Sequence, residues 1–184
     1  MQEKSLFKNS IYKSLLSIAN IAIPIIIGPY ITKLLDVNLY GAYNKVYAEF
    51  QIFLIFATFG IYTFGVREIS KIRNDEHKIA SLFTNLFVLG LITNLVVGII
   101  YVIYALVSSN GITTQIYMVF IIQIVANMFY IEFLNEALEN YKFITIKTLI
   151  VKILYLVLLL AFVRKPEDII PYSIIISFIV FLNN

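Results

Sequence analysis

The chain has 184 residues, of which 60% are hydrophobic and 14% charged, with a net charge of +3, no cysteine and one histidine. Soluble globular domains contain about 45–50% apolar and about 25% charged residues. The composition therefore excludes an ordinary soluble enzyme, a disulfide scaffold and a disordered chain. The mean hydropathy of +0.89 indicates a membrane protein, so we assign the basic excess to a membrane surface and predict no nucleic-acid partner.

Six apolar stretches follow one another along the chain. Each approaches the roughly 20 residues that a helix needs to cross about 30 Å of hydrocarbon, and none alternates as a barrel strand does. We predict an all-α, polytopic membrane protein with about six transmembrane helices. They lie near residues 14–35, 46–66, 80–107, 115–138, 146–163 and 169–184.

The basic residues predict the orientation. With a cytoplasmic N-terminus, nine of the 14 basic residues lie on the inner side, four lie outside and Lys152 lies within the fifth helix. Basic residues accumulate in cytoplasmic loops, so a cytoplasmic N-terminus is predicted. The last apolar stretch stops at Asn184 without a basic flank, from which we expect a fragment, a split gene product or a truncated chain.

The first predicted helix carries one polar face. Its small or polar residues fall within an arc of about 120°, and they are Ser14, Ser17, Asn20, Pro24, Gly28 and Thr32. This face meets either other helices, through close packing of small residues, or an aqueous cavity.

Two further helices carry polar or small residues at helical spacing. Lys45 and Glu49 are four residues apart and can form an ion pair, either among the outer headgroups or at the mouth of a cavity. In the third helix, the spacing of Gly90, Asn94 and Gly98 favours close packing of two helices.

The fourth predicted helix has the strongest polar signal. Glu132 and Glu136 share a face, one to two turns inside the cytoplasmic boundary, while Gln123 and Asn127 lie nearly opposite. Neighbouring carboxylates in a low dielectric repel each other, so one stays protonated or finds a cation. Lys152 is the candidate partner. The alternative is that Lys152 extends to the headgroups and the glutamates reach water.

No spacing typical of catalysis, metal binding or a phosphate loop occurs in the chain, so neither an enzyme nor a cofactor is predicted.

Two groups of short motifs carry a family resemblance. The first contains Tyr40-Gly41, Gly60-Ile61 and Gly65-Val66-Arg67-Glu68. The second follows the pattern I-x-W-F-x-x-G-x-E-x-Y-K-x-I-T-I-R, which is matched at Ile131, Glu139, Tyr141, Lys142, Ile144, Thr145 and Ile146. Together they resemble the polysaccharide-biosynthesis (Wzx-type) flippases of the multidrug/oligosaccharidyl-lipid/polysaccharide exporter superfamily. Phe133, Ala137 and Lys147 replace the Trp, Gly and Arg of the pattern, and Ala137 suggests slightly looser packing.

The resemblance implies a fold and an activity. Members have two pseudo-symmetric lobes around a central cavity, so residues 1–184 would form the N-terminal lobe, with the C-terminal lobe absent. The implied activity is transfer of undecaprenyl-diphosphate-linked oligosaccharides across the bacterial cytoplasmic membrane by alternating access, for capsular, exo- or surface polysaccharide. The candidate cavity or coupling residues are Asn20, Lys45, Glu49, Glu132, Glu136 and Lys152. The lysines would hold the diphosphate or sugar acids, and the glutamates would couple to protons or sodium or hold the lysines.

The expected partners are membrane lipids, the lipid-linked oligosaccharide, the missing lobe, a polysaccharide polymerase and glycosyltransferases. Two alternatives stay open: a non-transporting scaffold or truncated remnant in a polysaccharide-assembly complex, and a multidrug exporter of the same superfamily. A membrane-embedded transferase is disfavoured, because the chain shows no acid or histidine constellation that would form its site.

Overall fold

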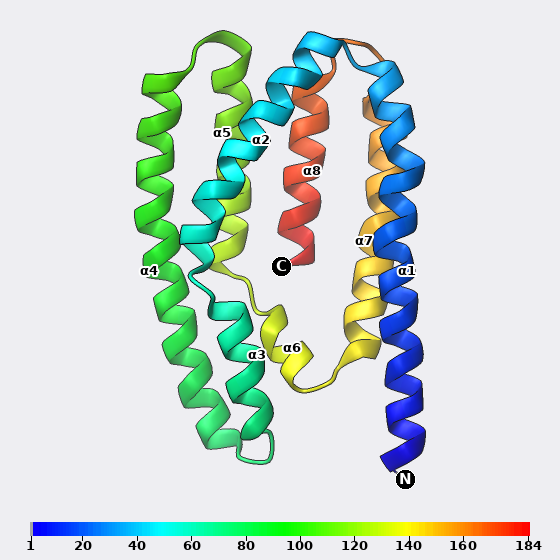
Figure 1. Ribbon diagram of the computed structural model, residues 1–184, viewed down its shortest axis with the longest axis vertical. Helices are drawn as coiled ribbons and strands as arrows, with labels where there is room; N and C mark the ends of the chain where they lie inside the picture. The colour runs from blue at the N-terminus through cyan, green and yellow to red at the C-terminus, as the bar shows by residue number, and fades with distance from the viewer. Residues whose placement is uncertain (1) are drawn as a thin grey trace.

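The computed structural model describes residues 2–184, with side chains from residue 10 onward. All regular elements in this part of the chain are α-helices, which confirms the predicted fold class (Figure 1). They are α1 (Gln2–Leu34), α2 (Val37–Thr58), α3 (Ile61–Lys71), α4 (Glu76–Ser108), α5 (Gly111–Met128), α6 (Glu132–Ala137), α7 (Tyr141–Phe162) and α8 (Ile169–Asn183).

Most of these helices have the length and composition of membrane spans. Within the described residues, five stretches qualify: Ser10–Leu34, Val37–Lys71, Glu76–Ser108, Gly111–Met128 and Tyr141–Phe162. The helix Ile169–Asn183 is apolar but shorter. The protein is therefore a multi-pass membrane protein.

The helices form a bundle of two groups, and the long helices α1 and α7 make up the smaller group. Helix α1 packs along α7, while α2, α4 and α5 pack together on the other side (Figure 1). Helix α8 contacts both α5 and α7 and so connects the two groups. In Figure 1 the described part of the N-terminus, the α3–α4 turn and the α6–α7 turn lie toward one end of the bundle, and the α1–α2, α4–α5 and α7–α8 turns lie at the opposite end.

Several helices begin earlier than predicted, because hydropathy marks the apolar span and not the helix start. Asp36 caps α2: its Oδ1 accepts hydrogen bonds from the backbone N–H groups of Asn38 (2.9 Å) and Leu39 (3.0 Å). Asp75 caps α4 through the N–H of Lys78 at 3.1 Å. Such caps supply acceptors for the free N–H groups of the first turn. The starts predicted near 14, 46, 80 and 146 are therefore corrected to 2, 37, 76 and 141.

Two predicted helices, 46–66 and 115–138, are interrupted and not continuous, although the first lies within the membrane-length stretch Val37–Lys71. The first break lies at Phe59 and Gly60, which adopt left-handed φ values of 45° and 70°. The second lies between α5 and α6, at residues 129–131. Both breaks redirect the chain so that α3 packs on α6, where Phe133 lies against Gly65. Local hydropathy does not report such a contact between segments far apart in the sequence.

Two apolar clusters stabilise the bundle. The larger surrounds the fully buried rings of Phe50, Tyr101, Tyr117 and Phe120. The smaller contains Ile69, Leu86, Phe133 and Ala137 from α3, α4 and α6. Ala137 has 0% exposure and belongs to this smaller cluster.

The predicted close packing along α4 is confirmed. Asn94 is buried, and its Nδ2 donates to the carbonyls of Ala57 (3.2 Å) and Gly90 (2.8 Å). Its Oδ1 accepts from Asn127 Nδ2 at 2.8 Å. A Cβ on Gly98 would lie only 3.3 Å from Ile124, so α4 and α5 approach closely at this glycine.

Candidate functional site

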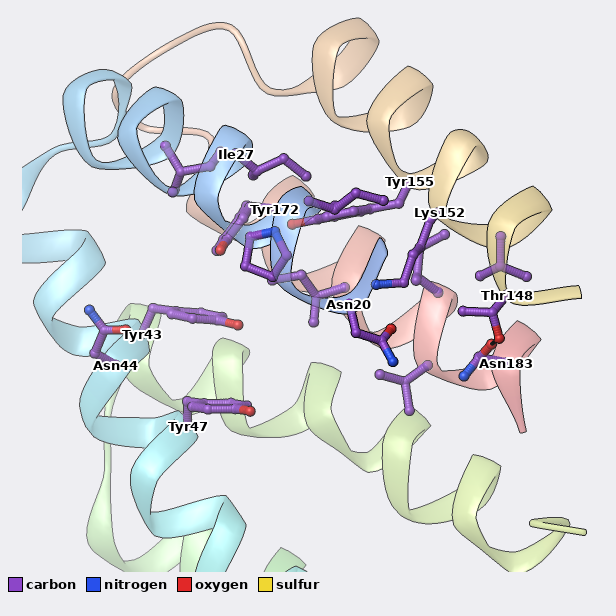
Figure 2. A pocket seen from close by; sticks show the side chains of 18 of the residues that line it. Asn20, Ile27, Tyr43, Asn44, Tyr47, Thr148, Lys152, Tyr155, Tyr172 and Asn183 are labelled. Atoms are coloured by element: carbon purple, nitrogen blue, oxygen red, sulfur yellow. Dashed lines mark hydrogen bonds between the residues drawn. The ribbon is translucent and has the colours of Figure 1, made fainter. Parts of the chain in front are cut away.

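A cavity of about 590 Å³ lies among α1, α2, α7 and α8. Its volume falls in the range of small-molecule binding sites, which is about 300–1,000 Å³. Most of its wall is aliphatic or aromatic. Among the described residues that line it, Lys152 is the one charged side chain (Figure 2).

One wall of the cavity comes from the predicted polar face of α1. Asn20, Pro24 and Gly28 line it at intervals of four residues. Pro24 has no N–H, so the carbonyl of Asn20 lacks its usual helical donor. The rest of that face lies elsewhere: Ser17 and Thr32 are exposed, and their hydroxyls donate to carbonyls of their own helix.

Lys152 reaches the cavity from α7. Its Nζ donates a hydrogen bond to the carbonyl oxygen of Ala19 at 3.2 Å, so the side chain crosses from α7 to the wall of α1. In Figure 2 the Lys152 ammonium and the Asn20 amide point into the same space. An ammonium carries three donor hydrogens, so two remain for a ligand. The structure thus brings together two of the six predicted site residues.

The predicted pairing of Lys152 with Glu132 or Glu136 is wrong. Glu132 forms a 2.6 Å ion pair with Lys147, whose Nζ also donates to the carbonyl of Asn183 at 2.5 Å. Glu136 accepts a hydrogen bond from the Tyr62 hydroxyl. The cause is the break before α6, which places the two glutamates beside the first turns of α7 and beside α3. They do not line the cavity.

Lys45 and Glu49 lie on α2 outside the cavity lining. The predicted ion pair is present at the limit of contact, with 4.0 Å between Lys45 Nζ and Glu49 Oε1 and 65% exposure of the lysine side chain. Glu49 instead accepts hydrogen bonds from the hydroxyls of Tyr104 (3.0 Å) and Tyr117. Its carboxylate therefore connects α2 with α4 and α5.

The cavity also contains polar groups that the sequence analysis missed. Thr148 on α7 donates to Asn183 Oδ1 at 3.4 Å across the α7–α8 interface, and both side chains line the cavity (Figure 2). Five tyrosines line it as well, and they are Tyr40, Tyr43, Tyr47, Tyr155 and Tyr172.

The tyrosines form an aromatic group around Tyr43. The rings of Tyr43 and Tyr47 stack with centroids 6.1 Å apart and planes 7° apart, and Tyr172 lies 5.0 Å from Tyr43. A signal for this group exists in the sequence, because Tyr40, Tyr43 and Tyr47 recur at helical spacing on one face of α2.

A multi-pass helical protein whose helices line a cavity with amides and, among the described residues, one cation has the features of a membrane transporter. The model of the family described as "Polysaccharide biosynthesis protein" matches residues 6–183, and the chain belongs to this family. This match confirms the resemblance found in the sequence motifs.

A curated relative supports the same assignment. The chain is 23% identical over 167 residues to a protein of Escherichia coli (strain K12) named "Putative O-antigen transporter". The match covers 90% of the chain and 40% of that relative, so the chain spans less than half of the relative's length. No solved structure shows a significant match.

Proposed function

We propose that the chain forms the N-terminal lobe of a flippase for undecaprenyl-diphosphate-linked oligosaccharides in the bacterial cytoplasmic membrane. Membership of the polysaccharide-biosynthesis family supports the substrate class, and the relative's name indicates transport of O-antigen by that protein. The observation that carries the proposal is the position of Lys152, a lone cation in an otherwise uncharged lining among the described residues.

The cavity chemistry fits the task of a flippase. A diphosphate and its sugars cannot cross hydrocarbon without polar groups to replace water. The Lys152 ammonium attracts a phosphate oxygen, and the apolar wall strengthens this attraction because the local dielectric is low. The Asn20 amide offers a neutral donor beside it. No covalent step is needed, because moving the headgroup requires only binding and release.

Alternating access would require a second lobe that closes the cavity from the other side. The charge distribution supports a cytoplasmic N-terminus in this proposal. Helix α3, the α3–α4 turn and the first turns of α4 and α7 lie toward the same end of the bundle as the described N-terminal part of the chain (Figure 1). These segments contain five basic residues, which are Arg67, Lys71, Arg73, Lys78 and Lys142. Glu49, Glu132 and Glu136 are proposed coupling residues for protons or sodium, acting through the helix contacts that they make.

The test replaces Lys152 in cells whose polysaccharide export depends on the chain. Lys152→Ala should lower export at least tenfold, and Lys152→Arg should retain most of it, because the cation is kept. Lys165 is an exposed lysine in the α7–α8 turn, and Lys165→Ala is the matched control. Protein level in the membrane is measured in parallel. Normal export by Lys152→Ala at an unchanged protein level contradicts the proposal.

A further inference from the structure

We propose that Tyr47 is the platform on which the cavity stacks the sugar ring attached to the diphosphate. This inference rests on the proposed function and extends it from the phosphate to the glycan. It assigns two chemically different ends to the cavity: an ammonium and amide end at Lys152 and Asn20, and an aromatic end on α2.

Among the five cavity tyrosines, Tyr47 alone is exposed. Tyr47 as a residue is 40% exposed, whereas Tyr43 and Tyr172 are buried and Tyr40 and Tyr155 are half-buried. Tyr47 therefore has ring surface available to a ligand, and the buried tyrosines serve as its support. In Figure 2 the rings of Tyr43 and Tyr47 lie one beside the other, with their hydroxyls pointing in the same direction.

The Tyr47 ring is held in place before any ligand binds. Tyr43 stacks against it with nearly parallel planes. Phe120 on α5, which is fully buried, contacts it in a T-shaped arrangement with centroids 6.2 Å apart. A ring fixed in this way loses little conformational entropy on binding, which makes fixed aromatic side chains effective contact residues.

The chemistry of a pyranose ring matches this surface. One face of the sugar carries C–H groups, which meet the negative face of an aromatic ring, and its rim carries hydroxyls. Asn44 lies one turn before Tyr47, lines the same cavity and is exposed. Its amide can both donate to and accept from the rim hydroxyls. A prenyl chain could also pack on a tyrosine, but it has no groups for Asn44.

The experiment measures binding to the full chain in nanodiscs with two probes. One is farnesyl diphosphate, and the other is farnesyl diphosphate linked to N-acetylglucosamine. The wild type should bind the sugar probe about tenfold more tightly, which is the order of magnitude of one well-packed aromatic contact. Tyr47→Leu should abolish this difference and leave the affinity for farnesyl diphosphate unchanged. Tyr47→Phe should keep most of the difference, because the ring is retained.

Two control variants separate this inference from the proposed function. Phe56→Leu removes an exposed aromatic ring of α2 outside the cavity lining and should change neither affinity. Lys152→Ala should weaken both probes by a similar factor.

The stacking role is overturned if the wild type binds both probes equally, or if Tyr47→Leu weakens both probes equally, as a prenyl contact would. Failure of Lys152→Ala to weaken farnesyl diphosphate overturns the phosphate site instead. If the wild type binds neither probe, both proposals are wrong.

Discussion

The contact between Gly65 and Phe133 allows a test of whether the packing of α3 on α6 stabilises the fold. A Cβ at Gly65 would lie 2.6, 3.0 and 3.2 Å from three ring atoms of Phe133, whereas carbon atoms in contact prefer about 3.5–4.0 Å. Phe133 is 1% exposed and packed in the smaller cluster, so its ring has little room to move. Gly65→Ala must therefore separate α3 from α6.

The magnitude follows from two opposing effects. Overpacking of this kind costs about 1–3 kcal/mol, and replacing a helical glycine by alanine returns about 0.5–1 kcal/mol. Gly65→Ala should thus lower the free energy of unfolding by about 1 kcal/mol, and by at most about 2.5 kcal/mol. Gly41→Ala is the matched control, because Gly41 lies within α2 and a Cβ there meets nothing within 4 Å. It should be neutral or stabilising by up to about 1 kcal/mol.

The assay is unfolding of the purified chain in mixed micelles with increasing denaturing detergent, followed by helical circular dichroism. Adding Phe133→Leu to Gly65→Ala should recover part of the loss, because the smaller side chain relieves the clash and neighbouring substitutions couple. The reasoning is refuted if Gly65→Ala is as stable as Gly41→Ala.

Two further predictions concern the turns. Asp36→Ala removes the cap of α2 and should lower the free energy of unfolding by about 1 kcal/mol, measured in the same detergent titration; an unchanged midpoint would show that the cap does not stabilise α2. The backbone N–H groups of Arg164 and Lys165 hold the pKa of Asp168 below its usual value. The Asp168 carboxylate therefore stabilises the fold fully above pH ~4, and this stabilisation is lost as the pH falls through the lowered pKa. Thermal unfolding between pH 2 and pH 7 should therefore depend less on pH in Asp168→Asn, and identical profiles would contradict this.

The all-helical class and the order of the apolar stretches could be predicted because the bilayer sets the length of a span. Their starts could not, because the caps Asp36 and Asp75 are polar and a hydropathy pattern does not register them. The two helix breaks are even harder to predict from the sequence. Gly60 is a local hint, since glycine adopts positive φ readily, but residues 129–131 contain no glycine or proline. Beyond that break, Phe133 lies against Gly65, and this contact between segments far apart in the sequence is visible only in the folded chain.

The candidate site was predicted in part, and the reason lies in what a search for polar groups in lipid can detect. Asn20 and Lys152 are costly in hydrocarbon, so they stand out in the sequence, and the structure brings both to one cavity. Glu132 and Glu136 stand out equally in the sequence. Their pairing with Lys152 was predicted for one continuous helix, but the helix is broken before α6. In the structure Glu132 pairs with Lys147, and Glu136 accepts a hydrogen bond from Tyr62.

The tyrosines could not be singled out in the sequence, because tyrosine is amphipathic and is tolerated both in a core and at an interface. Their position in the cavity adds a binding surface that the polar residues alone do not supply. A cation beside an amide can bind any anion, so Lys152 and Asn20 do not distinguish a lipid-linked glycan from a simple phosphate. A supported aromatic ring in the same cavity adds the missing discrimination, because it contacts the sugar and not the charge. Selectivity for a glycan should therefore depend on α2, whereas affinity for the diphosphate should depend on α7.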